Sequence, residues 1–451
     1  MGPAIRLVCA IVMVATVLTP ARGFAEDIHL TRYLHSHTVQ SGAAGQVEDR
    51  FAANPGPATL SVALSDPASS VSIVLNGESL TNEQAVSLQD SNHIVLHFNG
   101  PPGSRTQVRV QQTAVVELNV VSRIHFNTNV GNFEQARAFY GNLGFDTVSE
   151  FPDTNTIEMA EAIGVNTPTE YDGSQGDTAG GYLLHGELIG LGVMRGGVID
   201  LIEFSIPRNT EPPYQNLNHL GMARAIIHST DVDADYASLT QQGVPFIAAP
   251  ATRRDGTRFA IFSDPDGTYY ELRAVEGDAN PDGKTQMVSL GAINVNVSDF
   301  ERSRAWYQMF GYELDQRLSR TESLEVATAM GFTAAFEIDG ALLKHAGDGS
   351  ALELIEWISP HDSEPPYPLP VNHLGIHRMA FLTSDIEADV AALKAQGVEF
   401  ISDITPCCSG PESWGSIVAF YDPDGTIVEL AEQPLMGEIL TVIRWFRRLF
   451  D

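Results

Sequence analysis

The feature that most constrains the fold of this chain is an internal repeat. Three motifs occur twice: Asn-His-Leu-Gly at 218–221 and 372–375, Glu-Pro-Pro-Tyr at 211–214 and 364–367, and Asp-Pro-Asp-Gly at 264–267 and 422–425. Motifs that recur in the same order over this distance are typical of a duplicated structural unit. We therefore predict two copies of one module, at residues 121–275 and 288–434.

Each module is itself predicted to be double. In the first copy, Phe133–Leu143 and Val232–Gln242 carry apolar residues at helical spacing, and a glycine that can end a helix follows each segment. Alternating, strand-like segments surround both helices, among them 198–206 and 269–273. The pattern is βαβββ twice per module, which places the modules in the α+β class. A polar, glycine-rich stretch at 166–181 is predicted to be a loop inserted only in the first copy.

The charge of the chain excludes one class of partner. There are 26 Lys+Arg residues against 57 Asp+Glu residues, which gives a formal net charge of −31. Binding to nucleic acid requires clustered cationic side chains that neutralise phosphates, so no nucleic-acid partner is expected. The same negative charge disfavours adhesion of the body of the chain to anionic lipid.

The N-terminus has the pattern of a secretory signal. Arg6 precedes an apolar run at 7–18, and Gly23-Phe24-Ala25 supplies small residues at a cleavage site. We predict that residues 1–25 are removed and that the protein is secreted or periplasmic. The mature chain would keep the adjacent Cys407 and Cys408, a pair that rules out a long-range disulfide framework. Free thiols, a vicinal disulfide, a link to a partner and two loop residues without a role all remain open.

Two segments lie outside the repeated modules. Residues 26–120 contain short alternating strands separated by turn residues, which is typical of a small antiparallel β-sandwich with a spacer or adhesion role. Residues 435–451 are predicted to form an amphipathic helix with three arginines beside its apolar face. Such a helix could pack on a module, contact a partner subunit or lie on a membrane surface.

The modules resemble the vicinal oxygen chelate superfamily, also called glyoxalase/bleomycin-resistance/extradiol-dioxygenase proteins. The resemblance is carried by Ile124-His125-Phe126, Phe139-Tyr140 and Leu143-Gly144-Phe145, by the two Asp-Pro-Asp-Gly motifs, and by Trp306-Tyr307 in the second copy. It implies that paired βαβββ units curl into cups. It also implies that a divalent metal inside a cup holds two neighbouring oxygens of a small molecule.

In that family the metal takes one ligand from the first strand and one carboxylate from the last strand of each half-module. The first module has His125, Asp200 and Glu271 at three of these positions and Arg224 at the fourth. The second module has Ala292, Glu353, Arg378 and Glu429. The halves can be paired within one module or crossed between modules. Every pairing contains an arginine, which has no lone pair for a metal, so no complete four-ligand site is predicted.

Three interpretations of this pattern remain open. The arginines could form buried ion pairs with the carboxylates. Alternatively, Arg224 and Arg378 could bind an anionic group of a substrate in a bidentate manner. A three-ligand site in the cup that contains His125 could hold one divalent metal (Fe, Mn, Ni or Zn), with Asp200, Glu271, Glu353 and Glu429 as the carboxylate candidates.

His125, Asp200 and Glu271 are candidates for proton transfer as well as for metal binding, and three further histidines are candidates for proton transfer. His219 and His373 recur in the Asn-His-Leu-Gly motif, and His377 precedes Arg378. The alternative for the repeated pair is a role in capping a turn. The expected protein therefore binds a small oxygenated molecule, with two functions open. It is either a lyase, isomerase or dioxygenase with an atypical metal site, or a metal-free binding protein without catalysis.

Overall fold

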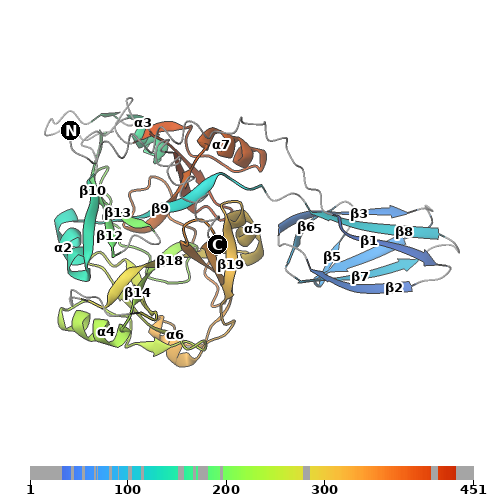
Figure 1. Cartoon of the computed structure of the whole chain (residues 1–451), viewed down its shortest axis with the longest axis horizontal. Helices are drawn as coiled ribbons and strands as arrows, with labels where there is room; N and C mark the ends of the chain where they lie inside the picture. The colour runs from blue at the N-terminus through green and yellow to red at the C-terminus, as the bar shows by residue number, and fades with distance from the viewer. Residues whose placement is uncertain are drawn as a thin grey trace, which may run out of the picture. The chain divides into compact units, whose positions relative to one another are not determined.

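The computed structural model describes most of the chain between residues 33 and 432. The gaps in this range are 42–44, 53–55, 65–67, 69, 81–83, 90, 100–103, 113–115, 151–156, 166–168, 171–180, 193–196, 278–284 and 408–414. The predicted signal segment and the predicted C-terminal helix lie outside the described residues, as does most of the predicted inserted loop. The chain divides into two compact units, Met1–Ala114 and Val115–Asp451 (Figure 1). In the described part of the chain, no helix is long and apolar enough to cross a membrane.

The first unit contains two four-stranded antiparallel sheets. One has the order β1-β8-β3-β6 and the other β2-β7-β4-β5. Its core takes residues from both sheets, with Leu60 and Leu88 from the first and Ile73, Ile94 and Leu96 from the second. Two sheets that share one core form a sandwich, as predicted. The strands are β1 (Tyr33–Ser41), β2 (Gly45–Ala52), β3 (Gly56–Leu64), β4 (Ser70–Leu75), β5 (Glu78–Leu80), β6 (Gln84–Leu88), β7 (Ser91–Asn99) and β8 (Ser104–Gln112).

The second unit contains the two modules and is α+β, as predicted. This unit begins before residue 120, since Leu118 already belongs to its buried core. The first module consists of β9 (Val120–Asn129), α2 (Phe133–Leu143), β10 (Phe145–Glu150), α3 (Ile157–Ala162), β11 (Thr169–Glu170), β12 (Gly181–Leu191), β13 (Val198–Ile206), β14 (Gly221–Ser229), α4 (Val232–Gln241), β15 (Ala251–Thr252), β16 (Arg258–Ser263) and β17 (Tyr269–Ala274).

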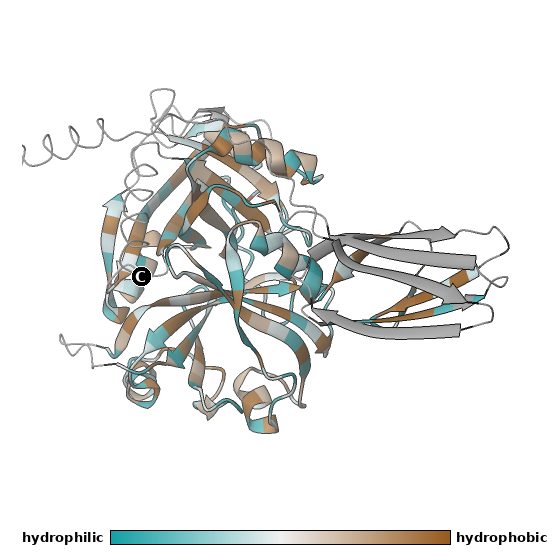
Figure 2. Cartoon of the chain, turned by 45° about the vertical axis from the view of Figure 1, so that its right-hand side comes forward, coloured by the Kyte–Doolittle hydropathy of each residue, from teal (hydrophilic) through white to brown (hydrophobic). Residues whose placement is uncertain are grey.

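The second module repeats this order without an equivalent of β11. It consists of β18 (Met287–Val297), α5 (Phe300–Gln308), β19 (Tyr312–Arg317), α6 (Leu324–Ala329), β20 (Glu337–His345), β21 (Ala351–Ser359), β22 (Gly375–Thr383), α7 (Ile386–Ala395), β23 (Thr405–Cys407), β24 (Gly415–Tyr421) and β25 (Ile427–Glu432). Short stretches of hydrophobic and hydrophilic residues alternate along the strands of this unit (Figure 2), as expected for strands with one face in a core.

The sheets do not follow the boundaries of the modules. One sheet has the order β10-β12-β13-β9-β22-β25-β24-β23, with β11 beside β12, and so joins the first half of module one to the second half of module two. The other has the order β15-β16-β17-β14-β18-β21-β20-β19 and joins the two remaining halves. Of the two pairings left open by the sequence, the structure has the crossed one.

The helix beginnings explain two repeated glutamates. Asn132 and Asp299 cap α2 and α5 by accepting hydrogen bonds from backbone N–H groups in the first turn. Glu203 accepts from Phe133 N at 2.8 Å, and its counterpart Glu356 accepts from Phe300 N at 2.9 Å. These glutamates therefore stabilise helix ends. The short helices α3 and α6 were not predicted, although Ser323 before α6 is a residue type that caps helices.

Candidate functional site

The crossed pairing gathers the eight predicted ligand positions into two sets. We call the sheet that contains β9 and β22 the histidine half-barrel, because its set is His125, Asp200, Arg378 and Glu429. We call the sheet that contains β14 and β18 the arginine half-barrel, because its set has Ala292 in place of the histidine, together with Glu353, Arg224 and Glu271. The two sets occupy equivalent places in pseudo-symmetric sheets and can be compared position by position.

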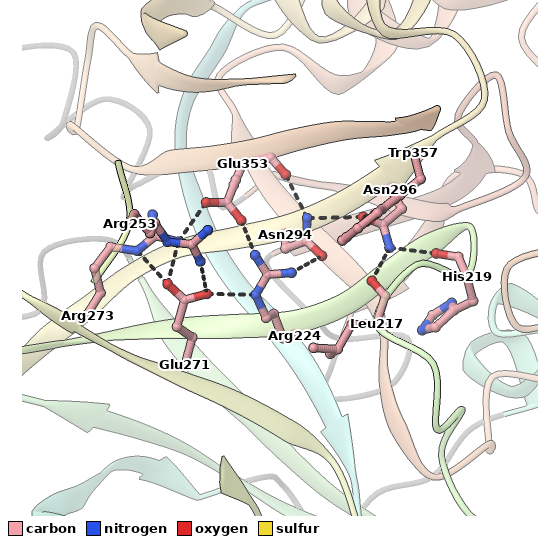
Figure 3. Close-up of polar contacts among 10 residues, drawn as sticks. All are labelled: Leu217, His219, Arg224, Arg253, Glu271, Arg273, Asn294, Asn296, Glu353 and Trp357. Carbon is pink, nitrogen blue, oxygen red and sulfur yellow. Dashed lines mark hydrogen bonds and ion pairs between the residues drawn. The ribbon is translucent and has the colours of Figure 1, made fainter. Parts of the chain in front are cut away.

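In the arginine half-barrel, the guanidinium of Arg224 lies between the two glutamates (Figure 3). Its Nε donates to Glu271 Oε2 at 2.9 Å, and its Nη2 donates to Glu353 Oε2 at 2.5 Å. A third bond runs from Nη1 to Asn294 Oδ1 at 3.0 Å. The side chain of Arg224 is fully buried and has no solvent contact. Its three nitrogens already donate to three protein acceptors. Arg224 was predicted to bind a substrate, but in the described residues its guanidinium has no accessible donor left for one.

Two further arginines complete this cluster, and sequence reasoning did not find them. Arg273 Nη2 donates to Glu353 Oε1 at 2.6 Å, and Arg273 Nε donates to Glu271 Oε1 at 2.8 Å. Arg253 Nη2 donates to Glu271 Oε2 at 3.0 Å. Burial acts to raise the pKa of Glu271, but the charges of Arg253, Arg273 and Arg224 outweigh burial and hold that pKa below its usual range. The pKa of Glu353 is lowered in the same way.

A chain of amides extends the network away from the cluster. Asn294 donates to Asn296 Oδ1 at 3.3 Å, and Trp357 Nε1 donates to the same oxygen at 3.0 Å. Asn296 Nδ2 in turn donates to the backbone oxygens of Leu217 and His219 at 2.8 and 2.7 Å. The arginine half-barrel is thus a buried, densely hydrogen-bonded network, which corresponds to the predicted ion-pair cluster.

The histidine half-barrel has looser contacts at the equivalent positions. Arg378 Nε lies 2.8 Å from Glu429 Oε1, but Arg378 Nη2 is 3.8 Å from Asp200 Oδ2. His125 Nδ1 is also 3.8 Å from Asp200 Oδ2. Asn127 Nδ2 donates to that same carboxylate oxygen. Contacts of 3.8 Å are too long for hydrogen bonds, so the set is close together but only partly paired.

Unpartnered polar atoms are concentrated in this half-barrel. Within the described residues, buried atoms without a hydrogen-bond partner include His125 Nδ1, Asn127 Oδ1, Asn129 Oδ1, Asp200 Oδ1, Arg378 Nε and Nη1, and both ring nitrogens of His377. At the equivalent positions of the arginine half-barrel, the asparagine oxygens and the glutamate oxygens have partners. Most buried polar atoms in proteins are hydrogen-bonded, so such a cluster indicates a place for a ligand or ordered water.

Burial sets the protonation of this site. Burial raises the pKa of Asp200 to about 7, assisted by Glu429 and opposed by Arg378 and Asn127. Burial and the charge of Arg378 lower the pKa of His125 to about 3, so its imidazole is neutral. The pKa of Glu429 is raised by burial. Burial and Arg378 also hold the pKa of His377 well below its usual range.

Six substitutions distinguish the half-barrels, the first being Asp200 in the place of the longer Glu353. Two histidines of the histidine half-barrel correspond to alanines at the equivalent positions of the arginine half-barrel. Ala292 corresponds to His125, and Ala223 corresponds to His377. Two arginines of the arginine half-barrel are absent from the other, where Cys407 replaces Arg253 and Ala431 replaces Arg273. Phe204 occupies the position of Trp357, so the histidine half-barrel lacks the indole N–H group that would donate to Asn129. Cys407 is disulfide-bonded, and both other cysteines of the chain lie outside the described residues.

The two histidines of the repeated motif lie in a different setting. His219 Nδ1 is 2.7 Å from Leu220 O, and its ring packs edge-on against Tyr214. His373 Nδ1 is 3.3 Å from Asn209 Nδ2, and its ring stacks with Tyr367. Among the described residues, no hydrogen bond or ion pair joins either imidazole to Asp200, Arg378 or Glu429. Their predicted role in proton transfer stays a prediction, and the contacts support packing of the loops.

Comparison with known proteins identifies the family. The sequence profile of the Glyoxalase/Bleomycin resistance protein/Dioxygenase superfamily matches residues 123–272 and 289–430, which is more than half of the chain. The chain belongs to this superfamily. The resemblance stated from the sequence is thereby confirmed, as is the arrangement of tandem modules. A comparison with curated proteins gave no match.

Solved structures with similar folds include several members of the glyoxalase and dioxygenase group. Glyoxalase I from Zea mays is 18% identical, with 71% of this chain and 95% of that chain covered and a TM-score of 0.48. A putative dioxygenase from Bacillus subtilis is 14% identical, covering 70% and 86% with a TM-score of 0.44. A mutant of 4-hydroxymandelate synthase from Streptomyces coelicolor is 13% identical, covering 73% and 99% with a TM-score of 0.23.

A divalent metal, which the superfamily resemblance implies, does not fit either set as it is arranged. In the arginine half-barrel, Arg224 occupies the space between the carboxylates that a dication would need. In the histidine half-barrel, Arg378 is paired with Glu429, one of the three remaining ligand candidates. No group of three or more His, Cys, Asp or Glu side chains is gathered for a metal anywhere in the described residues. A guanidinium at ligand distance repels a dication, so neither set fits a metal ion as it is arranged.

Proposed function

We propose that this superfamily member binds a small oxygenated organic molecule in the histidine half-barrel, and that its own side chains hold the molecule without a bridging metal. The observation that carries the proposal is the cluster of unpartnered buried atoms on His125, Asn127, Asp200 and Arg378. Leaving such atoms unsatisfied costs about 1–3 kcal/mol each, which a bound ligand would recover. The arginine half-barrel supplies the counterexample, because its equivalent atoms are already bonded to protein.

A screen of small oxygenated molecules tests this proposal. Binding to the full chain would be followed by ligand-observed NMR, and each hit would be repeated with Arg378→Met and with Trp357→Phe as the matched control. We expect hits whose affinity falls in Arg378→Met and is unchanged in Trp357→Phe, because Trp357 belongs to the other half-barrel. Hits that respond only to Trp357→Phe, or no hits from a broad screen, would contradict the proposal.

Proton transfer on the bound molecule, as in a lyase or isomerase, is the second candidate function. Asp200 supports it because its pKa of about 7 allows both protonation states near neutral pH, and its Oδ1 has no partner among the described residues. The neutral His125 lies 3.8 Å from its other oxygen and could exchange a proton once a ligand draws the groups together. With an identified ligand, deuterium exchange into its carbon-bound positions would separate catalysis from simple binding. Exchange that persists in Asp200→Asn would contradict this role.

The absence of a fit for metal can be tested by restoring the family's fourth ligand. Arg378→His would place a second imidazole beside His125, Asp200 and Glu429. Arg224→His would give the other half-barrel only one imidazole, because Ala292 lies opposite. We expect the unaltered chain to bind less than about one Zn²⁺, Mn²⁺ or Ni²⁺ per ten chains in equilibrium dialysis, with tight binding gained only in Arg378→His. Stoichiometric binding by the unaltered chain would contradict the metal-free proposal.

Export is proposed separately, on the pattern of charge, apolar run and small residues in 1–25. The test is the mass and N-terminal sequence of the protein recovered from its native cells. A mature N-terminus at Glu26 supports export, and an intact N-terminus in the cytosolic fraction would contradict it.

A further inference from the structure

The unpartnered atoms of the histidine half-barrel specify the kind of ligand that fits. Two of them are amide oxygens whose orientation is fixed by their partners. Asn127 turns its NH₂ group to the Asp200 carboxylate, and Asn129 donates to the backbone oxygens of Val371 and His373 at 2.6 and 2.9 Å. An amide that donates through nitrogen presents oxygen on its other side. Both free amide atoms are therefore hydrogen-bond acceptors.

Three unpartnered oxygens stand beside two unpartnered guanidinium nitrogens. Asp200 Oδ1 adds the third oxygen to those of Asn127 and Asn129, Arg378 Nε and Nη1 are the guanidinium nitrogens, and the unpartnered imidazole nitrogens of His125 and His377 can donate or accept. The charges lean the same way, because two carboxyl groups, Asp200 and Glu429, accompany one arginine. In the arginine half-barrel the balance is reversed, with three guanidinium groups for two carboxylates. A ligand that satisfies the three oxygens of the histidine half-barrel must bring several donor groups, and the excess of carboxyl groups over guanidinium groups disfavours a further negative charge.

We infer that the ligand of the histidine half-barrel is a neutral or cationic molecule bearing several hydroxyl or amino groups, and not a carboxylate or phosphate. The inference rests on the proposed function and narrows its ligand class. Hydroxyl or ammonium groups of the ligand donate to Asn127, Asn129 and Asp200, and one ligand oxygen accepts from Arg378. This differs from the expectation of an anionic ligand, because Arg378 is already paired with Glu429.

Three molecules of nearly equal size separate these possibilities. They are 2-amino-1,3-propanediol, which is a cation at pH 8, glycerol, which is neutral, and glycerate, which is an anion. Dissociation constants for the full chain would be measured at pH 8 by saturation-transfer NMR. We expect the aminodiol to bind about tenfold or more tightly than glycerate, with glycerol between them, because one unit of ligand charge beside a buried carboxylate changes affinity by at least that factor.

Variants locate the effect and keep it distinct from the proposed function. Asp200→Asn replaces an acceptor oxygen by a donor of the same size and should weaken the aminodiol about fivefold or more, whereas Trp357→Phe should leave it unchanged. Tryptophan fluorescence of each variant checks the fold. If glycerate binds most tightly and depends on Arg378, the proposed function stands and the donor-rich ligand class is overturned. If none of the three binds, the ligand class is overturned as well, and the broader screen decides the proposed function. Binding that no variant in the histidine half-barrel alters would overturn both.

Discussion

The two half-barrels are built from equivalent halves of the repeated modules but differ in the contacts of their central charged side chains. In the arginine half-barrel, Arg224 donates to both glutamates and an asparagine, Arg273 binds the other two carboxylate oxygens, and Arg253 shares Glu271 Oε2 with Arg224. In the histidine half-barrel, the equivalent Arg378 is within hydrogen-bond distance of one carboxylate only, and buried atoms around it lack partners. Arginines at equivalent positions thus have different surroundings. Arg224 is the centre of a fully hydrogen-bonded network in one sheet, and Arg378 is part of a site with unpartnered atoms in the other.

The largest expected effect comes from removing the central arginine of each half-barrel. Arg224→Met removes one of the two arginines that bridge Glu271 and Glu353 in a fully buried site, and we expect a loss of about 3–5 kcal/mol in the free energy of unfolding. Arg378→Met removes one close ion pair and should cost about 1–2 kcal/mol, because Glu429 can take up a proton. Urea unfolding followed by tryptophan fluorescence measures both, since no tryptophan lies within residues 26–120.

Equal losses in the two methionine variants would contradict the comparison. If Arg224→Met does not fold, Glu353→Gln serves as the milder change, because glutamine keeps an oxygen that accepts from Arg224. It should still destabilise the protein more than Asp200→Asn does.

The pH dependence of stability should have opposite signs in the two half-barrels. The folded-state pKa of Asp200 is about 7, against 3.8 for an unperturbed group, with His125 and Asn127 on β9, Arg378 on β22 and Glu429 on β25 facing it. The folded protein therefore retains a proton that the unfolded chain releases, and stability falls as pH rises from about 4 to about 7. A shift of three units corresponds to at most roughly 4 kcal/mol. Asp200→Asn should flatten this slope in stability measured at several pH values.

The glutamates of the arginine half-barrel supply the opposite slope. Their pKa values are lowered by the arginines, so their contribution is present above the ordinary carboxyl range and is lost as pH falls below about 4. Glu271→Gln should remove part of this acid sensitivity and leave the slope between pH 4 and 7 intact. A slope between pH 4 and 7 that is unchanged in Asp200→Asn would contradict the assignment of that slope to Asp200.

The smallest expected effect concerns one indole N–H group. Trp357→Phe leaves Asn296 Oδ1 without its bond from the ring but with its bond from Asn294, and we expect a loss of about 1 kcal/mol in the free energy of unfolding. The reciprocal change, Phe204→Trp, offers a donor to the unpartnered Asn129 Oδ1 and should weaken ligand binding in the histidine half-barrel. Denaturation and the NMR titration described above measure the two effects. A gain in ligand affinity for Phe204→Trp would show that Asn129 is not part of the site.

Much of this architecture follows from the sequence because it depends on local patterns. The repeat and the helices near 133–143 and 232–242 can be recognised from the order of residues. The same is true of Arg224, which occupies the fourth ligand position of the first module. The crossed pairing is not, because the contacts of β9 with β22 and of β14 with β18 join strands far apart in the chain or in different modules. Arg253 and Arg273 were missed for a related reason. They are not at family ligand positions, and only the fold brings them to Glu271.

The asparagines could have been found. Asn127 and Asn129 recur as Asn294 and Asn296 at the same spacing within the first strand of each module, on the face of the ligand position. Two amides repeated in a strand indicate buried hydrogen bonding. Which of them would lack partners could not be predicted. For Asn296 and Asn129 it depends on Trp357 in one sheet and Phe204 in the other, and for Asn294 and Asn127 it depends on whether the central arginine donates to the amide oxygen.

Crystallographic screening with small hydroxyl- and amine-bearing fragments tests the central claim most directly, because both half-barrels are exposed to the same molecules in one experiment. We predict fragment density in the histidine half-barrel, within hydrogen-bond distance of Asp200, Asn127 and Arg378, and unbroken contacts between Arg224 and its two glutamates. Fragments bound between Glu271 and Glu353, with Arg224 displaced and the histidine half-barrel empty, would contradict the account.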